Sequence, residues 1–267
     1  MNVLESFSCR GKVALVTGGG GLQGGYGAQI SEALYEAGAT VYVASRSLEK
    51  LREFAARYPG MKALALDLSE EKSVRAAVDT ILRDEGRLDI LGNNAVLRCA
   101  LEKWDLPTEL YDESLHTNAS GLFLITRLAA ESMRERRSGS IINIASYMGM
   151  LGLDPANYAG TGTQTDSDVL PSPVYHYEKG GMINFTRWAA SVLGKFNIRV
   201  NSVSLVGYCA DWEKNPSRFT RNHASLTMLG RLANSTDLKG GIVYLASDAS
   251  AFVTGTNLII DGGYSAK

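Results

Sequence analysis

The sequence predicts an α/β fold, a doubly wound parallel sheet in a single domain, and two observations support it. The chain of 267 residues is 45% hydrophobic and holds 28 glycines, which suits one large domain with a well-buried core. Short apolar runs alternate with helical patterns along nearly its whole length. Repeated βα units of this kind form parallel sheets with right-handed crossovers and helices on both faces. Ligands then bind at the carboxyl ends of the strands.

The first half of the chain begins the alternation. The apolar run KVALVT at 12–17 ends at glycines, as a strand buried on both faces does, and a helical pattern follows at 30–37. TVYVAS at 40–45 and KALAL at 62–66 are the next predicted strands, separated by a charged helix at 48–57.

The second half continues the same pattern. Strands are predicted at 90–92, 140–145, 198–203 and 257–260, with helices between them. A helix at 175–190 would place Tyr175 and Lys179 on one face, one turn apart. The whole chain, 1–267, is expected to form one domain.

A glycine-rich stretch, TGGGGLQGGYG at 17–27, follows the first strand directly and opens a helix. Glycines allow a tight turn and a close backbone approach to a pyrophosphate, and the helix N-terminus offers unsatisfied N–H groups. Its place inside a βαβ unit favours a dinucleotide site in a Rossmann fold over a merely flexible loop.

The end of the second strand carries Ser45 and Arg46 where NAD-binding folds usually place an acid for the ribose 2′-hydroxyl. No carboxylate is there to repel a 2′-phosphate, and the guanidinium can grip one through charge-assisted hydrogen bonds. We therefore expect NADP(H) to be favoured, with NAD(H) possible. Under the alternative interpretation, Arg46 is only a solvated charge at a helix entry.

Tyr175 and Lys179 form a candidate acid–base pair. A free tyrosine has a pKa of about 10, and a cation about 4 Å away, at an effective dielectric near 20, lowers it by up to about three units. A positioned acid or base with a pKa near the operating pH contributes on the order of 10² to 10⁴ in rate. The pair alone is weak evidence of catalysis, because Tyr-x-x-x-Lys also occurs on ordinary helix surfaces.

Several further motifs follow one another along the chain. They are Asp67-Leu68-Ser69, Asn93-Asn94-Ala95, Asn118 in HTNASG, Ser146 in IINIAS, Leu245-Ala246-Ser247-Asp248, and Thr254-Gly255 followed by Asp261-Gly262-Gly263. With the glycine-rich stretch and the Tyr175–Lys179 pair, this ordered set resembles the short-chain dehydrogenase/reductase family over nearly the whole chain.

The resemblance implies a catalytic tetrad of Asn118, Ser146, Tyr175 and Lys179. Tyr175 would exchange the hydroxyl proton while nicotinamide C4 exchanges a hydride, and Ser146 would hydrogen-bond the carbonyl oxygen. Lys179 would hold the nicotinamide ribose, and Asn118 would anchor a water beside it. Cofactor contacts are implied for Gly18, Gly25, Tyr26, Gly27, Ser45, Arg46, Asp67, Leu68, Asn94, Ala95, Tyr175, Lys179 and Val206.

The chain departs from the family pattern at four places. Val96 replaces the glycine of N-N-A-G, and Leu205-Val206-Gly207 replaces a Pro-Gly after the sixth strand. The long spacing between Ser146 and Tyr175 predicts an inserted loop at 158–173, rich in hydroxyl groups, which either contacts a polyhydroxylated substrate or touches nothing. The stretch 207–231 is expected to be a substrate lid whose arginines either bind an anion or are solvated.

Two functions from different classes follow. The favoured one is an NAD(P)-dependent oxidoreductase that interconverts a secondary alcohol and a ketone, with a sugar, sugar acid or polyol preferred over simple ketones, steroids and acyl-chain intermediates. The alternative is a catalytically idle member of the family that binds nucleotide as a scaffold or sensor. A Ser-His-Asp hydrolase is poorly supported, since Ser146 does not stand in a G-x-S-x-G elbow.

Composition limits the partners. The balance of 27 basic and 28 acidic residues argues against nucleic acid or a membrane surface. No run is apolar enough to span a bilayer and no signal peptide is evident, so a cytoplasmic location is expected. The three histidines show no metal-ligand spacing and the cysteines no paired spacing, which predicts no metal. The resemblance implies a homotetramer whose subunits meet through the helices carrying Asn118 and Tyr175 and through the C-terminal segment.

Overall fold

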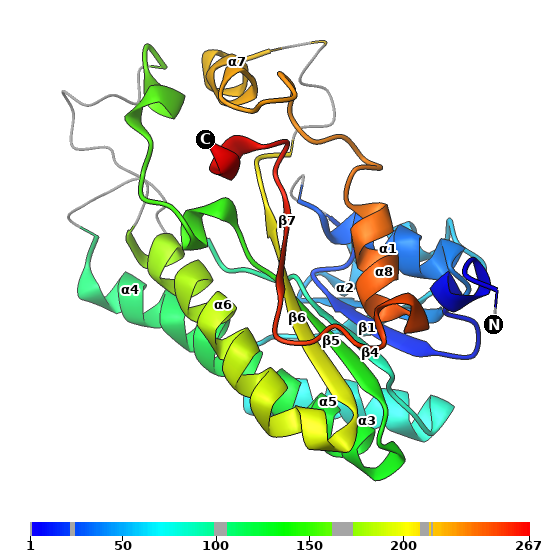
Figure 1. The fold of residues 1–267 in the computed structure, drawn as a ribbon. Helices are drawn as coiled ribbons and strands as arrows, with labels where there is room; N and C mark the ends of the chain where they lie inside the picture. The colour runs from blue at the N-terminus through cyan, green and yellow to red at the C-terminus, as the bar shows by residue number, and fades with distance from the viewer. Residues whose placement is uncertain (1, 22–24, 99–105, 162–172, 209–213, 215) are drawn as a thin grey trace.

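The computed structural model describes residues 2–21, 25–98, 106–161, 173–208, 214 and 216–267. Over these residues, seven strands form one parallel sheet in the order β3-β2-β1-β4-β5-β6-β7 (Figure 1). The strands are β1 (Val13–Thr17), β2 (Thr40–Ser45), β3 (Lys62–Ala65), β4 (Ile90–Asn93), β5 (Gly139–Ile144), β6 (Ile198–Leu205) and β7 (Asn257–Ile260).

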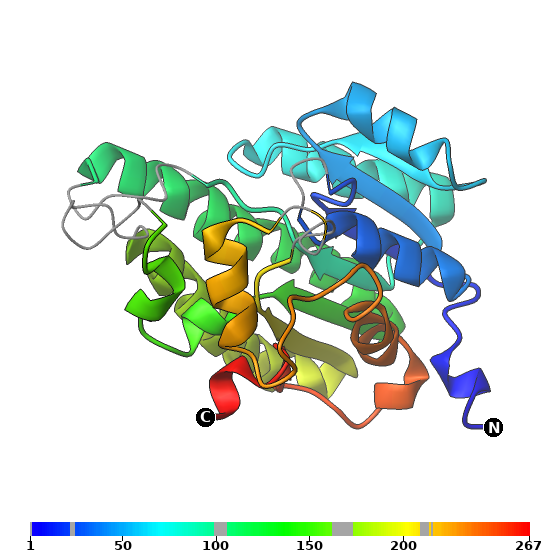
Figure 2. The ribbon, with the colours of Figure 1, turned by 90° about the horizontal axis from the view of Figure 1, so that it is seen from above.

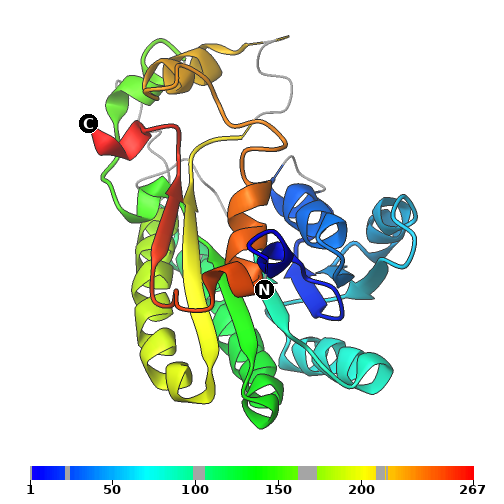
Figure 3. The same cartoon turned by 45° about the vertical axis from the view of Figure 1, so that its right-hand side comes forward.

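Helices cover both faces of the sheet (Figure 3). One face packs against α1 (Gly27–Glu36), α2 (Leu48–Ala55) and α8 (Lys239–Ala246), and the other against α3 (Glu71–Glu85), α5 (Gly121–Arg136) and α6 (Pro173–Leu193). The remaining α-helices of the described chain are α4 (Thr108–Leu115) and α7 (Arg218–Ser225). This arrangement confirms the predicted doubly wound Rossmann fold in a single domain.

The core lies in the two layers between sheet and helices. Ile30 and Leu34 of α1 are fully buried in the first layer, and Ile81 of α3 and Ile125 of α5 in the second. Each such side chain contributes about 1.5–3 kcal/mol when it leaves water. The strand ends that carry polar side chains are therefore held on a rigid support.

The strand order reverses at β1, with β2 and β3 on one side and β4 to β7 on the other. The carboxyl ends of β1 and β4 consequently flank a topological switch point, where open α/β sheets bind ligands. Seen from above, α7, residues 155–161 and the C-terminal segment lie over this same end of the sheet (Figure 2).

The predicted elements are confirmed with small shifts at their ends. β6 runs two residues beyond the predicted end, because Ser204 and Leu205 pair with β7. α1 begins at Gly27, three residues before its predicted start, and α6 extends past both predicted ends. Of the predicted insertion at 158–173, residues 162–172 lie outside the described part of the chain.

Candidate active site

A cavity of about 860 Å³ opens at the carboxyl ends of the strands, around the switch point. Every residue predicted to contact the cofactor lines it: Gly18, Gly25, Tyr26, Gly27, Ser45, Arg46, Asp67, Leu68, Asn94, Ala95, Tyr175, Lys179 and Val206. Ser146 lines it as well, whereas Asn118 does not. The structure thus brings together residues that are up to 188 positions apart (Gly18 to Val206) in the sequence.

The turn after β1 is built on two glycines that cannot carry a side chain. A Cβ at Gly27 would stand 1.9 Å from the carbonyl oxygen of Gly18, so the start of α1 packs directly on the turn. Gly18 itself has a φ of +65°, which favours glycine. Gly25 differs from both, because a Cβ there would meet nothing within 4 Å and would point into open space.

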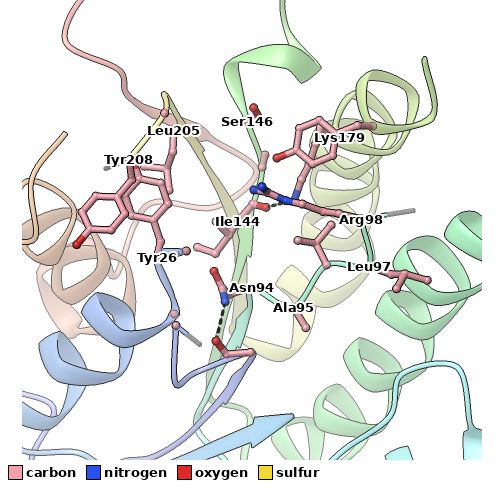
Figure 4. A pocket seen from close by; sticks show the side chains of 18 of the residues that line it. Tyr26, Asn94, Ala95, Leu97, Arg98, Ile144, Ser146, Lys179, Leu205 and Tyr208 are labelled. Carbon is pink, nitrogen blue, oxygen red and sulfur yellow. Dashed lines mark hydrogen bonds between the residues drawn. The ribbon is translucent and has the colours of Figure 1, made fainter. Parts of the chain in front are cut away.

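The segment after β4 is clamped to this turn by Thr17. The Thr17 hydroxyl oxygen accepts hydrogen bonds from the backbone N–H groups of Asn94 and Ala95, each at 3.0 Å. In return, Asn94 Nδ2 donates to the Thr17 carbonyl at 3.1 Å and to the Gly18 carbonyl at 3.2 Å. Figure 4 shows the Asn94 side chain at the cavity wall. These reciprocal bonds give Thr17 and Asn94 a structural reason to stand where they do.

Ser45 and Arg46 line the cavity at the end of β2, next to Asp67 at the end of β3. Asp67 Oδ1 accepts hydrogen bonds from the Ser69 hydroxyl at 2.7 Å and from the Ser69 N–H at 3.0 Å. The hydroxyl bond is the largest cause that lowers the pKa of Asp67, and the positive charge of Arg46 acts in the same direction. Arg46 is exposed at the rim, with no carboxylate on its own strand end.

Lys179 is buried on the inner face of α6, with 4% of its surface exposed. Its ammonium donates a hydrogen bond to the Ile144 carbonyl at 2.6 Å and lies 5.5 Å from the centre of the Tyr175 ring. Burial lowers the pKa of Lys179, while Tyr175 and Glu178 oppose that effect. Ser146, also buried, begins a short 3-10 helix by accepting the Met148 N–H at 3.2 Å.

Asn118 lies behind the cavity wall, in a π-helical turn at His116–Ser120. Its side chain binds both polar groups of the Leu97 backbone, since Oδ1 accepts a hydrogen bond from the Leu97 N–H at 2.7 Å and Nδ2 donates one to the Leu97 carbonyl at 2.8 Å. π-helical turns inside α-helices are frequent at functional sites. The structure therefore assigns Asn118 a positioning contact that was not predicted, and its role toward a water stays a prediction.

Glu178 is a buried acid that sequence analysis missed. Only 7% of its surface is exposed, and its carboxylate accepts hydrogen bonds from Ser114 Oγ at 2.7 Å and Asn118 Nδ2 at 3.0 Å. Burial raises the pKa of Glu178, whereas these two hydrogen bonds and the Lys179 charge lower it. The available signal was its spacing of four from the buried residues Val174 and Met182 on α6.

Tyr26 connects the glycine-rich turn to Leu205-Val206-Gly207, the segment after β6 where the family usually has Pro-Gly. The Tyr26 hydroxyl donates to the Val206 carbonyl at 2.7 Å, and its ring packs on Tyr208 at 5.1 Å between centroids. Burial is the main cause that raises the pKa of Tyr26, so it stays a neutral donor. Leu205 and Val206 are themselves buried. A proline is therefore not needed to fix this stretch.

The predicted lid at 207–231 is described in part, because residues 209–213 and 215 lie outside the described chain. Arg218, Phe219 and His223 of α7 line the cavity. Arg221 instead donates to the Pro216 carbonyl at 2.6 Å within the lid. His223 is 2% exposed, stacks on Tyr264, and burial lowers its pKa to about 4, which keeps the ring neutral at pH 7.

The described residues offer neither a metal site nor a membrane-spanning helix. Across the described ranges, no three His, Cys, Asp or Glu side chains are grouped in a way that could hold a metal ion. Within the same part of the chain, no helix combines the length and apolar character that crossing a membrane requires.

Comparison with known proteins decides the family. A family model described as enoyl-(acyl carrier protein) reductase matches residues 21–265. The chain belongs to the short-chain dehydrogenase/reductase family. Cyclopentanol dehydrogenase of Comamonas sp. is 34% identical over 96% of this chain and 98% of its own length. D-threitol dehydrogenase of Mycolicibacterium smegmatis is 30% identical over 100% and 98%.

A solved short-chain dehydrogenase/reductase structure extends the likeness. Gluconate 5-dehydrogenase from Burkholderia cenocepacia, in complex with NADP and tartrate, superposes with a TM-score of 0.85 at 26% identity over the full length of both chains. As a short-chain dehydrogenase/reductase, the protein is an NAD(P)-dependent oxidoreductase that acts on CH–OH groups. This membership favours the enzyme over the idle nucleotide-binding scaffold.

Proposed function

We propose that the protein is an NADP(H)-dependent oxidoreductase that interconverts a secondary alcohol and a ketone on a polyhydroxylated substrate, with Asn118, Ser146, Tyr175 and Lys179 as its catalytic tetrad. The main support for this proposal is that Ser146, Tyr175 and Lys179 line the same cavity as the glycine-rich turn after β1. The nicotinamide, when bound, supplies or accepts the hydride.

The residues of the turn fit a dinucleotide. The absence of side chains at Gly18 and Gly27 brings the backbone and the N-terminus of α1 to the cavity wall, where they favour a diphosphate. Arg46 supports the preference for NADP(H), because its exposed guanidinium follows Ser45 at the end of β2, a strand end that carries no acid of its own. The gluconate 5-dehydrogenase relative, which binds NADP, is in keeping with this.

The proton chemistry belongs to α6 and to the end of β5. Tyr175 gives a proton to the substrate oxygen during reduction and takes it back during oxidation. Lys179, which donates a hydrogen bond to the Ile144 carbonyl, would stabilise the phenolate and would hold the nicotinamide ribose. Ser146 donates a hydrogen bond to the same substrate oxygen, where negative charge develops.

Hydroxyl side chains in the cavity wall support a polyhydroxylated substrate. They come from several elements at the catalytic end: Ser146, Tyr158, Thr161, Tyr175, Tyr208 and Ser217. D-threitol dehydrogenase and gluconate 5-dehydrogenase, both relatives of this chain, are named for polyhydroxylated substrates. Thr161 and Tyr158 belong to the beginning of the predicted insertion, which supports a substrate role for that loop.

The activity is tested by following nicotinamide absorbance with a panel of sugars, sugar acids, polyols and simple ketones. We expect turnover on polyhydroxylated compounds, and a loss on the order of 10² to 10⁴ in kcat in Tyr175→Phe. Turnover that survives in Tyr175→Phe would refute the tetrad, and turnover on simple ketones alone would refute the substrate class.

The cofactor preference has its own test. Arg46→Ala should weaken NADPH binding by about 10- to 150-fold, the loss expected for hydrogen bonds to a charged group, and leave NADH binding unchanged. Arg52→Ala, at an exposed position of α2 outside the cavity, is the matched control. Equal binding of NADH and NADPH by the wild type would contradict the preference.

We also propose a cytoplasmic homotetramer. Phe123 of α5 and Trp188 of α6 are large aromatic side chains with about half of their surface exposed, as expected of a face that another subunit covers. Light scattering after size-exclusion chromatography should give four times the mass of one chain, 28.7 kDa. A monomer at micromolar concentration would contradict the assembly.

A further inference from the structure

Positive charge is concentrated at the catalytic end of the cavity. Among the described residues that line it, the charged side chains are Arg46, Asp67, Arg98, Lys179 and Arg218. Arg46 and Asp67 belong to the ends of β2 and β3, on the far side of β1 from Ser146 and α6. The described wall around the reacting groups therefore holds three cations and no carboxylate.

Arg98 is a cation at the catalytic end of the cavity to which the proposed proton and hydride transfer assigns no role. It follows Leu97, whose N–H and carbonyl are both held by Asn118, so the backbone from which it projects is fixed. Figure 4 shows its side chain extending into the cavity, in front of Lys179 and below Ser146. Arg98 makes no hydrogen bond or ion pair with any residue that the structure describes.

Arg218 lines the same cavity from the first position of α7. Its guanidinium packs against Gly160, where a Cβ would stand 3.4–3.5 Å from the guanidinium atoms. This is an ordinary contact distance, and the φ of +67° at Gly160 is the feature that favours glycine there. Arg218, like Arg98, lacks a carboxylate partner among the described residues.

Arg98 and Arg218 are exposed to solvent, line the same cavity and have no carboxylate partner among the described residues, an arrangement that favours a bound anion. Arginine presents a planar set of N–H donors that matches both oxygens of a carboxylate. The charge of Arg98 is also one of the influences that lower the pKa of Lys179, although burial is the largest. A carboxylate bound at Arg98 would remove this repulsion and help Lys179 to keep its proton.

We propose that Arg98 is the anchor for a carboxylate of the substrate, assisted by Arg218 from α7, so that the substrate is a polyhydroxylated carboxylic acid rather than a neutral polyol. This inference rests on the proposed function, since the hydroxyl groups of the wall and the tetrad define the rest of the same site. The start of α7 would then contact the charged end of the substrate, while Ser146 and Tyr175 contact the oxygen on its reacting carbon.

The test compares an aldonate with the alditol of the same carbon number and configuration. The wild type should oxidise the aldonate with a kcat/KM at least tenfold higher. Arg98→Gln should lower kcat/KM for the aldonate by about 10- to 150-fold, mainly through KM, and leave the alditol unchanged. Arg98→Lys should fall between, because it keeps the charge and loses the planar pair of donors.

Controls separate the substrate from the cofactor and from the fold. The affinity for NADPH and the melting temperature should not change in Arg98→Gln, and Arg52→Gln, at an exposed α2 position outside the cavity, should behave as wild type. Arg218→Gln should show a smaller loss that is again confined to the aldonate. Equal losses for aldonate and alditol, or weaker NADPH binding, would overturn the proposal.

A binding measurement keeps this inference separate from the proposed function. Titration of the aldonate into NADPH-loaded Tyr175→Phe, with and without Arg98→Gln, does not require turnover. Binding that Arg98→Gln abolishes would support the carboxylate anchor even if no polyhydroxylated compound were turned over. Binding that is indifferent to Arg98 would overturn it, even if the oxidoreductase activity were established.

Discussion

Gly27 and Gly25 stand two positions apart in the turn after β1, yet they should fail in different ways when a methyl group is added. In Gly27→Ala the new Cβ would lie 1.9 Å from the Gly18 carbonyl oxygen, about 1.5 Å short of an ordinary contact. No rotamer change can relieve a clash between a Cβ and a backbone atom. In Gly25→Ala the Cβ would meet no protein atom within 4 Å.

The balance of effects at Gly27 can be estimated. Overpacking of this kind typically costs 1–3 kcal/mol and sometimes more, so we take about 3 kcal/mol. The helical preference of alanine over glycine returns about 1 kcal/mol. The net loss of about 2 kcal/mol corresponds to a fall of about 4–8 °C in melting temperature for a chain of this size.

Thermal unfolding without cofactor and NADPH titration together distinguish the two glycines. Gly27→Ala should melt earlier and also bind NADPH more weakly, because α1 must move away from the turn. Gly25→Ala should melt as wild type does, and bind NADPH more weakly only because its methyl group adds bulk to the cavity wall where we propose that the diphosphate binds. A Gly27→Ala variant that melts with the wild type, or an equal destabilisation of both variants, would refute this reasoning.

Two further predictions concern buried titratable groups. Glu178→Ala should lower the free energy of unfolding, measured by chemical denaturation, by about 1–3 kcal/mol for each donor that it leaves unpaired on Ser114 and Asn118. Glu178→Gln should keep most of the stability, because the amide oxygen can still accept a hydrogen bond from Asn118. Equal losses in both variants would contradict this account. Burial lowers the pKa of His223 from 6.5 to about 4, so the unfolded chain binds a proton there that the folded protein does not, between pH 6.5 and 4. The stability that neutral His223 contributes should therefore be present above pH 6.5 and fall by up to about 3 kcal/mol toward pH 4. His223→Gln should flatten the pH dependence of unfolding in this window, and a curve parallel to that of the wild type would show that another group is responsible.

The periodicity of the chain predicted the strands well because a parallel sheet buried on both faces leaves long apolar runs. KVALVT and TVYVAS are such runs, and β1 and β2 lie within a residue of their predicted limits. The ends of β6 and α6 were less predictable, since they depend on pairing with β7 and on packing across the sheet. Local sequence does not contain these long-range contacts.

The residues of the site, like the secondary structure, were predictable where they belong to local motifs and were missed where they depend on distant contacts. Residues on motifs, such as Ser146 and Tyr175, were predicted to lie together, and the structure places both at one cavity. Asn118 does not line the cavity, and its amide holds the backbone of Leu97, while its place in the tetrad stays a prediction. Glu178 and Arg98 were missed because an isolated acid or arginine looks solvated until the partners, or the lack of them, are known.

The hydrogen bonds from Asn118 to the Leu97 backbone fix the start of the segment after β4 independently of the reacting groups, and this separation affects how such enzymes diverge. Tyr175 and Lys179 stand on the long helix α6 and Ser146 follows β5, while other residues that line the cavity belong to the segment after β4, to residues 158–161 and to the start of α7. Changes in those segments can alter the accepted molecule without disturbing the groups that react. Relatives about one third identical can thus be named for a ring alcohol and a four-carbon polyol, and a new preference can evolve by a few substitutions on an inherited reaction centre.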